Sequence, residues 1–528
     1  MIKKILKVLF VIILLFDNFI VVKAVSNTEF LPQKYDLRNV DGKSFVTPAR
    51  NQGRAGSCWA FAAMASLESG IMKKNGGILI KNQEEKHKGI DFIDLSEEHM
   101  DRNHGYGYFP KKAGRYECAI SYLNSRKGPY LEKDFPFGKI NSDGTYESPN
   151  NKEVTDEKIP YFVQGIQFIE DIDVNTFTDN KTMLHKIKAT KKAIMNYGAV
   201  SSNIYQAHDK NGTFPYTNDK YYNENTFAYY CDGKDGKYDN NSNHAISIIG
   251  WDDNFSKDNF KTKPKYNGAW ICKEEQGSSF GDNGFYYVSY ESACVTTTQY
   301  CFKDVVKAEE GFDGIVQNDK LGLTGFMENN FSSSKGKDTY FNVFTAKEDC
   351  KLKAVGFYSM GNSSRYKIYI IDNFKKFSKE FNGLKDFSNI GSKYLNTSGT
   401  TSNAGYSTIN LTKPLNIKKG QQYAIGLWID TSDNFNWMNI NNGKNDYVFE
   451  TKKDINPNSK KAVINSNETY VYDEEGMFNM DFEPCILVDT HTLVQASHSI
   501  KAFKNIGNLC LKGYYDKINN NKKIIDKD

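Results

Sequence analysis

One cysteine of this chain lies in a sequence context that suits nucleophilic chemistry. Residues 51–61 read NQGRAGSCWAF, in which a loop with two glycines leads to Cys58 at the start of an amphipathic pattern. A helix N-terminus carries roughly half of a positive elementary charge, which favours thiolate over thiol. Because the thiolate is the effective nucleophile, Cys58 is a candidate for covalent catalysis. The alternative is a buried structural cysteine, the commonest fate of a free thiol.

Two further residues could assist such a thiolate. Gln52 lies six residues before Cys58, and its side-chain amide could donate a hydrogen bond to a developing oxyanion. His244 begins the strand-like segment HAISIIGW, and an imidazole can serve as general base and general acid. We expect the remaining histidines to be structural or merely exposed: His87, His99, His104, His185, His208, His491 and His498.

Together these motifs resemble those of papain-like cysteine peptidases. In that family a loop glutamine, the cysteine of a GSCWAF run and the histidine of an Asn-His-Ala strand are the oxyanion donor, the nucleophile and the general base. The matching residues are Gln52, Cys58 and His244. Further similarity lies in LPQKYDLR at 31–38, which is similar to a mature amino-terminus, DLSEE at 94–98 and GDNGF at 281–285. The resemblance covers about half of the chain and implies a two-lobed α+β domain at residues 31–300.

The sequence departs from the family pattern where the family orients its histidine. Family members carry a Lys-Asn-Ser-Trp-Gly run, whose asparagine holds the imidazole and whose tryptophan shields that hydrogen bond, but this chain has KEEQG at 273–277. The resemblance therefore places Glu274 at the orienting position. A carboxylate can hold an imidazole and raise its pKa. Glu275 adds a second acid, however, and Gln276 in place of tryptophan predicts that water reaches the pair.

The elements that position these residues follow from the periodicity of the sequence. Residues 59–74 have helical spacing and stop at an Asn-Gly-Gly turn, whereas 244–251 and 284–290 have strand-like patterns. From 314 to 489 the runs TYFNVFTA, LKAVGFYS, YKIYII, QQYAIGLWI and DYVFET recur between turn residues, which is typical of an all-β sandwich. We expect the domain boundary at 301–313 and a disordered Asn/Lys-rich tail at 513–528.

Residues 314–489 resemble the lectin-like β-sandwich that follows the papain-like domain in clostridial cell-surface cysteine peptidases. The similarity rests on NVF at 342–344, LKAVGFY at 352–358, YKIY at 366–369 and the strand at 420–428. It implies a carbohydrate ligand, with Tyr340, Trp428 or Trp437 stacking on sugar rings, unless these aromatic residues simply fill the core. Such sandwiches often hold a structural calcium ion, although no segment here has the pattern of a calcium-binding loop.

The N-terminal segment and the composition bear on location and partners. Residues 1–24 place three lysines before a short apolar run and end in alanine, which predicts a cleaved signal peptide and a secreted or cell-surface protein without an integral membrane segment. The six residues 25–30 leave no room for the inhibitory prodomain usual in the family. A net charge of +4 over 528 residues argues against nucleic acid as a partner. Nine cysteines without CxxC pairs favour neither a zinc framework nor a dense disulfide scaffold, and the odd number means that at least one thiol is free or pairs between molecules.

These features predict a secreted papain-like cysteine endopeptidase that hydrolyses peptide bonds through the Cys58 thiolate and His244. Its partners would be polypeptide substrates and, through the lectin-like domain, cell-wall or host glycans, and catalysis would need no cofactor. The principal alternative is a catalytically weakened or inactive relative that acts as a surface adhesin or carbohydrate-binding protein, which the replacements at Glu274 and Gln276 favour. A peptidoglycan amidase or endopeptidase with a Cys-His site fits the location but not the spacing of Gln52 and Cys58.

Overall fold

The computed structural model separates the chain into two compact units, Met1–Gln33 and Lys34–Asp528. It describes residues 31–80, 92–106, 114–148, 158–207, 220–233, 242–328, 339–381, 387–431, 445–451, 469–473, 486–489 and 506–518. The predicted signal peptide at 1–24 lies outside these residues.

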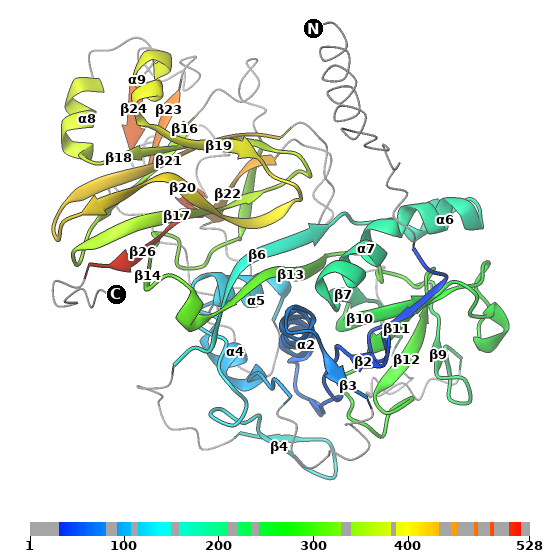
Figure 1. The fold of residues 1–528 in the computed structure, drawn as a ribbon. Helices are drawn as coiled ribbons and strands as arrows, with labels where there is room; N and C mark the ends of the chain where they lie inside the picture. Colours follow the sequence, from blue (N-terminus) through cyan, green and yellow to red (C-terminus); the bar gives the residue numbers. More distant parts are fainter. Residues whose placement is uncertain are drawn as a thin grey trace, which may run out of the picture. The chain divides into compact units, whose positions relative to one another are not determined.

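A mixed, largely antiparallel sheet of thirteen strands dominates the second unit (Figure 1). Its strands are β1 (Lys34–Asp36), β6 (Tyr161–Ile169), β7 (Val200–Ile204), β8 (Tyr222–Asn223), β9 (Ala228–Tyr229), β10 (His244–Asp252), β11 (Ala269–Lys273), β12 (Phe285–Ser289), β13 (Gln299–Lys307), β14 (Gly314–Val316), β17 (Cys350–Ser359), β20 (Gly405–Ile417) and β26 (Leu511–Lys517). The order is β14-β26-β17-β20-β6-β13-β7-β10-β11-β12-β9-β8, and β1 pairs with β10. The strands predicted at 244–251 and 284–290 are confirmed as β10 and β12. Strand β10 is buried along almost its whole length, which is why its sequence is a nearly continuous apolar run.

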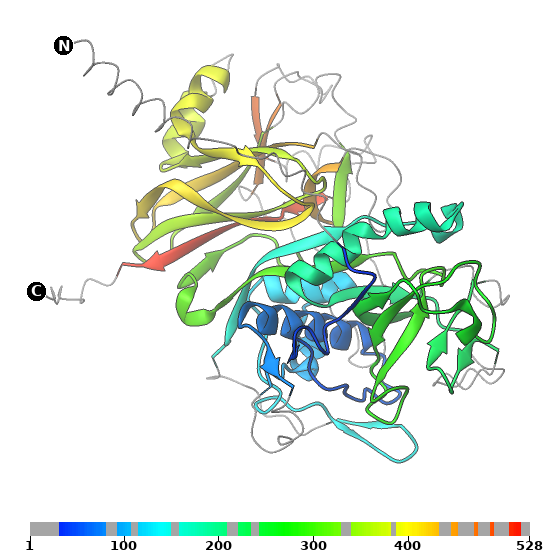
Figure 2. The ribbon, with the colours of Figure 1, turned by 45° about the vertical axis from the view of Figure 1, so that its right-hand side comes forward.

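Helices of the first domain pack around this sheet. They are α2 (Cys58–Lys74), α4 (Glu97–Asn103), α5 (Tyr116–Asn124), α6 (Asn180–Lys186) and α7 (Lys188–Tyr197). Helix α2 contacts α4, α5, β7, β10 and β13 (Figures 1 and 2). Its side chains are buried around most of its circumference. It ends where Gly76 and Gly77 adopt positive φ angles of 84° and 74°, which confirms the predicted helix and its stop. The described part of this domain also has two short antiparallel strand pairs. In the first, β2 (Lys43–Ser44) pairs with β3 (Ile78–Leu79), and in the second, β4 (Lys139–Ile140) pairs with β5 (Tyr146–Glu147).

The second domain is a β-sandwich with two short helices. A second sheet has the order β19-β18-β21-β16-β23-β24 and packs on the β17 side of the large sheet, with Leu352, Phe357, Ile368 and Ile425 in the shared core. Its strands are β16 (Thr339–Thr345), β18 (Arg365–Ile371), β19 (Leu395–Thr400), β21 (Gln422–Asp430), β23 (Thr469–Asp473) and β24 (Ile486–Asp489). The remaining elements are β15 (Gly325–Glu328), β22 (Asn445–Thr451), β25 (Ile506–Leu509), α8 (Phe374–Phe381) and α9 (Phe387–Tyr394). The five predicted strand runs are confirmed as β16, β17, β18, β21 and β22.

The C-terminal segment corrects two expectations. Strand β26 pairs with both β14 and β17, and Leu511 and Tyr514 are buried, so the second domain does not end at residue 489. The prediction of disorder from residue 513 is wrong for 513–518. That prediction relied on the Asn/Lys-rich composition of the tail and overlooked the apolar and aromatic residues that complete the sandwich. Residues 519–528 lie outside the described part of the chain.

The two domains are continuous through their sheet and core. Strand β13 carries the first domain past residue 300 to Lys307, and β20 of the second domain pairs with β6 of the first. Across the same junction Asn124 donates a hydrogen bond of 2.8 Å to the Tyr358 hydroxyl, and the Tyr106 hydroxyl donates one of 2.6 Å to the Leu321 carbonyl. The second domain therefore supports the sheet from which the first domain is built.

Candidate active site

Cys58 is the first residue of helix α2, as the glycine-containing loop before it predicts. The carbonyl of Ser57 accepts hydrogen bonds from the N–H groups of Ala60 and Phe61, which closes the first turn. Cys58 is half-buried at the edge of a cavity of about 420 Å³ that His244 also lines. The thiol thus lies at the positive end of the helix and faces a space that a ligand can enter.

His244 and Cys58 form a coupled pair. Burial alone would raise the pKa of the Cys58 thiol, but its hydrogen bond to His244 and the imidazolium charge bring that pKa below its ordinary value. Burial alone would lower the pKa of His244, but the charges of Glu274 and Cys58 raise it well above its ordinary value. Both shifts favour thiolate and imidazolium at the same pH, which is the reactive form of a cysteine–histidine pair.

Glu274 provides the contact that holds the imidazole. It follows β11 directly, and its backbone N–H donates to the carbonyl of Gly284 at 2.9 Å. Oε1 of Glu274 lies 2.6 Å from Nε2 of His244. Because Nε2 faces this carboxylate, Nδ1 is the ring nitrogen left for the thiol. The structure therefore places Glu274 where the sequence resemblance puts the orienting residue.

The expectation that water reaches this pair is wrong. The side chains of His244 and Glu274 are 1% and 0% exposed, although Gln276 replaces the shielding tryptophan. Two loops close over the contact: the N–H of Gln52 donates to the carbonyl of Glu275 at 2.9 Å, and the N–H of Gly277 donates to the carbonyl of Arg50 at 2.9 Å. The contact is thus buried without an aromatic ring at position 276, and the loops on either side of it are joined by backbone hydrogen bonds.

The same pairing brings Gln52 into the site. Its side chain is buried, and within the described structure its Oε1 has no hydrogen-bond partner. Its backbone is tied to the loop that carries Glu274, and its carbonyl accepts from the N–H of Ala55 at 3.2 Å in the turn that leads to Cys58. All four residues singled out in the sequence therefore belong to one connected structure at the start of α2 and β10.

A buried polar layer beneath the site was not anticipated from the sequence. Lys273 donates a 2.8 Å hydrogen bond to the hydroxyl of Thr47, which donates a 2.6 Å bond to Glu68 on α2. Glu68 also accepts from the N–H of Leu95 at 2.8 Å. Burial lowers the pKa of Lys273 and raises that of Glu68. The one available signal was Glu68 itself, an acid inside the apolar helix WAFAAMASLESGIMKK.

The described histidines outside the site have structural surroundings. His99 packs between Tyr130 and Phe135, and burial lowers its pKa to about 4. His104 lies edge-on to Trp59, and His185 is in α6. Histidines 87, 208, 491 and 498 lie outside the described residues.

Of the three aromatic residues considered for sugar stacking in the second domain, one is buried in the core, one is half-buried and one lies outside the described residues. Tyr340 is 2% exposed, so its proposal as a sugar-stacking residue is wrong: it points into the sandwich core. Trp428 is half-buried, with Nζ of Lys367 4.7 Å from its ring centroid. Trp437 lies outside the described residues. Trp428 thus remains the described candidate for a ligand contact.

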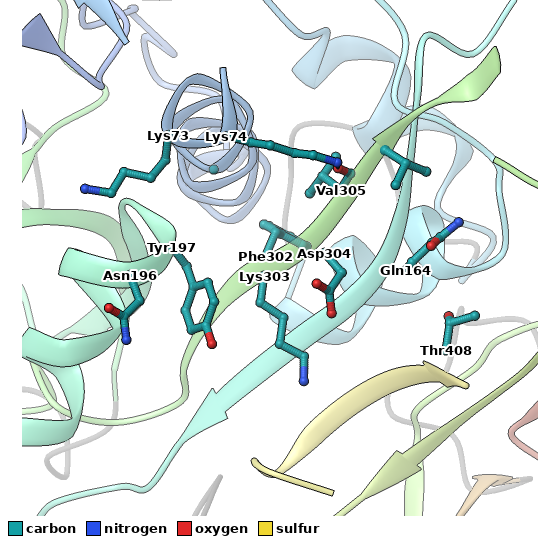
Figure 3. Close-up of a pocket in the computed structure, with 12 residues that line it drawn as sticks. Lys73, Lys74, Gln164, Asn196, Tyr197, Phe302, Lys303, Asp304, Val305 and Thr408 are labelled. Atoms are coloured by element: carbon teal, nitrogen blue, oxygen red, sulfur yellow. The ribbon is translucent and has the colours of Figure 1, made fainter. Parts of the chain in front are cut away.

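A second cavity, of about 560 Å³, lies away from this chemistry (Figure 3). Lys73 and Lys74 approach it from α2, and Lys303 and Asp304 approach it from β13. Lys74 is engaged by the carbonyl of Val305 at 2.7 Å. None of the four site residues lines this cavity, so the smaller one beside Cys58 is the candidate for substrate binding.

Comparisons with known proteins agree with this arrangement. Residues 31–303 match the family described as "Papain family cysteine protease", and residues 315–514 match "Lectin like domain". The chain is 25% identical to a cathepsin L-like peptidase of Aedes aegypti over 48% of its length, and 28% identical to fruit bromelain of Ananas comosus over 49%. It spans 58% and 55%, respectively, of the length of these two relatives.

Among solved structures, the chain is similar to the clostridial cysteine protease Cwp84 after propeptide cleavage. Identity is 26% and the TM-score 0.64, with 90% of this chain and 97% of that one covered. A structure of the cysteine protease and lectin-like domains of Cwp84, described as a surface layer associated protein of Clostridium difficile, covers 92% of this chain and 89% of its own at 25% identity, also with a TM-score of 0.64. With half of its length matched by the family pattern, the chain belongs to the papain family of cysteine proteases, and a lectin-like domain follows its protease domain.

Proposed function

We propose that this protein is an active cysteine endopeptidase in which a glutamate replaces the orienting residue of the family. The observation that carries the proposal is the 2.6 Å contact between Nε2 of His244 and Glu274, with both side chains shielded from water. In a water-excluded site a carboxylate stabilises an imidazolium more than a neutral amide does. Glu274 therefore supports, rather than disables, the ion pair with Cys58.

The chemistry follows from acyl transfer to sulfur. The Cys58 thiolate attacks the scissile carbonyl, and His244 donates its Nδ1 proton to the leaving amine, which leaves a thioester. His244 then takes a proton from water as the water oxygen attacks the thioester, which releases the acid product and leaves the Cys58 thiolate beside the imidazolium. The backbone N–H of Cys58 and the amide of Gln52 donate to the oxyanion in both steps.

We place the protein outside the cell or at its surface. The predicted signal peptide at 1–24 supports export, and the similarity to Cwp84, a surface layer associated protein, supports the surface. Among the described residues no helix combines the length and apolarity that a membrane crossing requires.

Cleavage of casein under reducing conditions tests the proposal. The chain should cleave casein, whereas Cys58→Ala and chain pretreated with a thiol alkylator should not. Circular dichroism and thermal unfolding confirm that the variant remains folded. A folded wild-type chain without thiol-dependent cleavage would reject the proposal in favour of an adhesin built on an inactive peptidase.

For the lectin-like domain we propose binding of cell-wall or host glycans. The family match supports it, as does half-buried Trp428, whose indole could stack on a sugar ring. Because β20 pairs with β6, the test uses the whole Cys58→Ala chain on a glycan array rather than an isolated domain. Binding that Trp428→Ala reduces supports the assignment, and an array without signal rejects it. Calcium in this domain stays a prediction; calcium-dependent thermal stability would test it.

A further inference from the structure

Three potential metal ligands converge on the side of His244 that faces away from Cys58. They are Nε2 of His244 and a carboxylate oxygen each from Glu274 and Glu275, and all three atoms lie within 4.8 Å of one another. Nε2 is 2.6 Å from Oε1 of Glu274 and 3.6 Å from Oε2 of Glu275. Within the described part of the chain, no other group of three or more His, Cys, Asp or Glu side chains has this spacing.

Glu275 is a separate indication that this cluster has a ligand. Glu275 is only 3% exposed, yet among the described residues its Oε2 has no hydrogen-bond partner. A buried carboxylate oxygen that accepts no hydrogen bond is costly and unusual in native proteins, and the nearest cationic atom, Nε2 of His244, is 3.6 Å away. The backbone carbonyl of Glu275 is held by the N–H of Gln52 at 2.9 Å, so the side chain is directed into the cluster by a fixed loop.

The donor set selects a class of metal. One imidazole nitrogen and two carboxylate oxygens suit zinc-like transition metals, whereas calcium and magnesium prefer oxygen donors alone. Tetrahedral zinc with bonds of about 2.1 Å separates its ligands by about 3.4 Å. The 3.6 Å pair already fits, and the 2.6 Å pair requires the Glu274 carboxylate to move away from Nε2 when a metal ion binds. We propose that His244, Glu274 and Glu275 form a binding site for one divalent transition-metal ion such as Zn²⁺, which reversibly switches off the peptidase.

The effect on catalysis follows from the nitrogen involved, and this part rests on the proposed peptidase function. A metal ion on Nε2 takes the place of the proton that His244 shares with Glu274, and that proton leaves to solvent. The ring is then a neutral, metal-bound imidazole, which donates its Nδ1 proton to a leaving amine less readily than an imidazolium does. Removing the metal restores the proton and the activity.

Metal binding is tested first in the full-length Cys58→Ala chain, which lacks the reactive thiol. Titration with Co²⁺ should give one equivalent of bound ion with the visible absorption of a four- or five-coordinate nitrogen and oxygen site, and Zn²⁺ should displace it. Glu275→Gln, added to this chain, should weaken binding by at least about 10- to 100-fold, the loss that even an outer-shell partner causes. Glu309→Gln, at an exposed position, is the matched control and should bind as its parent does.

Three results would overturn the site: no saturable binding, a sulfur-to-cobalt charge-transfer band, or unchanged affinity in folded Glu275→Gln. If the Glu275→Gln variant does not fold, the cobalt spectrum of the Cys58→Ala chain is the test of the metal site. In the cysteine-containing chain, Zn²⁺ should stop casein cleavage at one equivalent, EDTA should restore it, and Ca²⁺ and Mg²⁺ should have no effect. Cleavage without metal binding rejects the site and leaves the peptidase, whereas binding without cleavage in EDTA rejects the peptidase and leaves the site.

Discussion

Replacing Glu274 with glutamine tests whether the carboxylate acts through its charge. Glutamine keeps the length of the side chain and an oxygen that can accept from Nε2 of His244, but it removes the negative charge 2.6 Å from the ring. If Glu274 is a positioning residue that stabilises the imidazolium, the variant should change the pH profile of peptidase activity. A purely structural role would lower activity at every pH without moving the profile.

The size of the shift can be worked out from this contact. At an effective dielectric constant of about 20, charges 3–4 Å apart attract by roughly 4–5 kcal/mol. A neutral hydrogen bond retains roughly half of the strength of a charged one, so the net loss is about 2 kcal/mol. Losing this stabilisation of the imidazolium lowers the pKa of His244. Because the folded pKa of His244 is raised by Glu274, losing the charge means that the imidazolium deprotonates at lower pH.

The assay is kcat/KM for a fluorogenic peptide between pH 4 and 10, with EDTA throughout. The alkaline limb should move down by about 1.5 pH units, with activity at acidic pH reduced by about tenfold or less. The acid limb should also move slightly down, because Glu274 disfavours the Cys58 thiolate. The two limbs report the coupled pair rather than either residue alone.

Glu275 is the neighbour that could mask this result. Burial and the charge of Glu274 raise the pKa of Glu275 well above its ordinary value, which favours the neutral form of its side chain while Glu274 is charged. Once Glu274 is neutral, Glu275 can ionise 3.6 Å from His244 and replace part of the lost charge. Glu274→Gln/Glu275→Gln should therefore show the full shift, and Glu309→Gln should show none. An alkaline limb at the wild-type position in the folded double variant would refute the reasoning.

Three further expectations concern the oxyanion, the thiolate and the second domain. Gln52→Ala should lower kcat by about 10²–10³-fold, as loss of one oxyanion donor does, with little change in KM. A decrease in kcat of less than about threefold would show that Gln52 is not an oxyanion donor. Alkylation of Cys58 by iodoacetamide, measured by mass spectrometry, should remain fast below pH 8. The reason is that the thiolate persists as the pH falls until the lowered pKa of Cys58 is reached. An alkylation rate with the pH dependence of an ordinary thiol would contradict the ion pair. Lys512→Met should destabilise the chain by about 3–5 kcal/mol in urea unfolding, because it leaves Asp319 buried without its cation; a change below about 1 kcal/mol would show that Asp319 is protonated in the fold.

Much of the site could be predicted from the sequence because its signals are local. The loop before Cys58, the start of its helix and the strand that begins at His244 each depend on a few consecutive residues. The residues on either side of KEEQG match the family pattern without insertions or deletions, which was enough to place Glu274 at the orienting position. The strands of the second domain were equally visible, because alternation and turn residues are local properties too.

Other predictions failed where distant segments meet. Water was expected at Gln276, but His244 and Glu274 are buried where loops about 225 residues apart in the sequence pair through their backbones. Tyr340 was one of three aromatic residues considered for sugar stacking, but it is buried in the core between the two sheets. The segment after residue 513 was expected to be disordered, although β14 and β17 pair with it. Each error assigned exposure from composition, and exposure depends on what packs against a segment.

The sequence by itself located the candidate nucleophile, the candidate general base and the unusual acid at the orienting position, since local residue types and spacing define these. Only the tertiary structure decided the environment of that acid. It brought Glu275 to 3.6 Å from His244, buried both carboxylates, and joined the domains through β6 and β20. The physical reason is that charge state and metal affinity depend on distance and solvent exclusion, which arise only when segments far apart in the chain pack together.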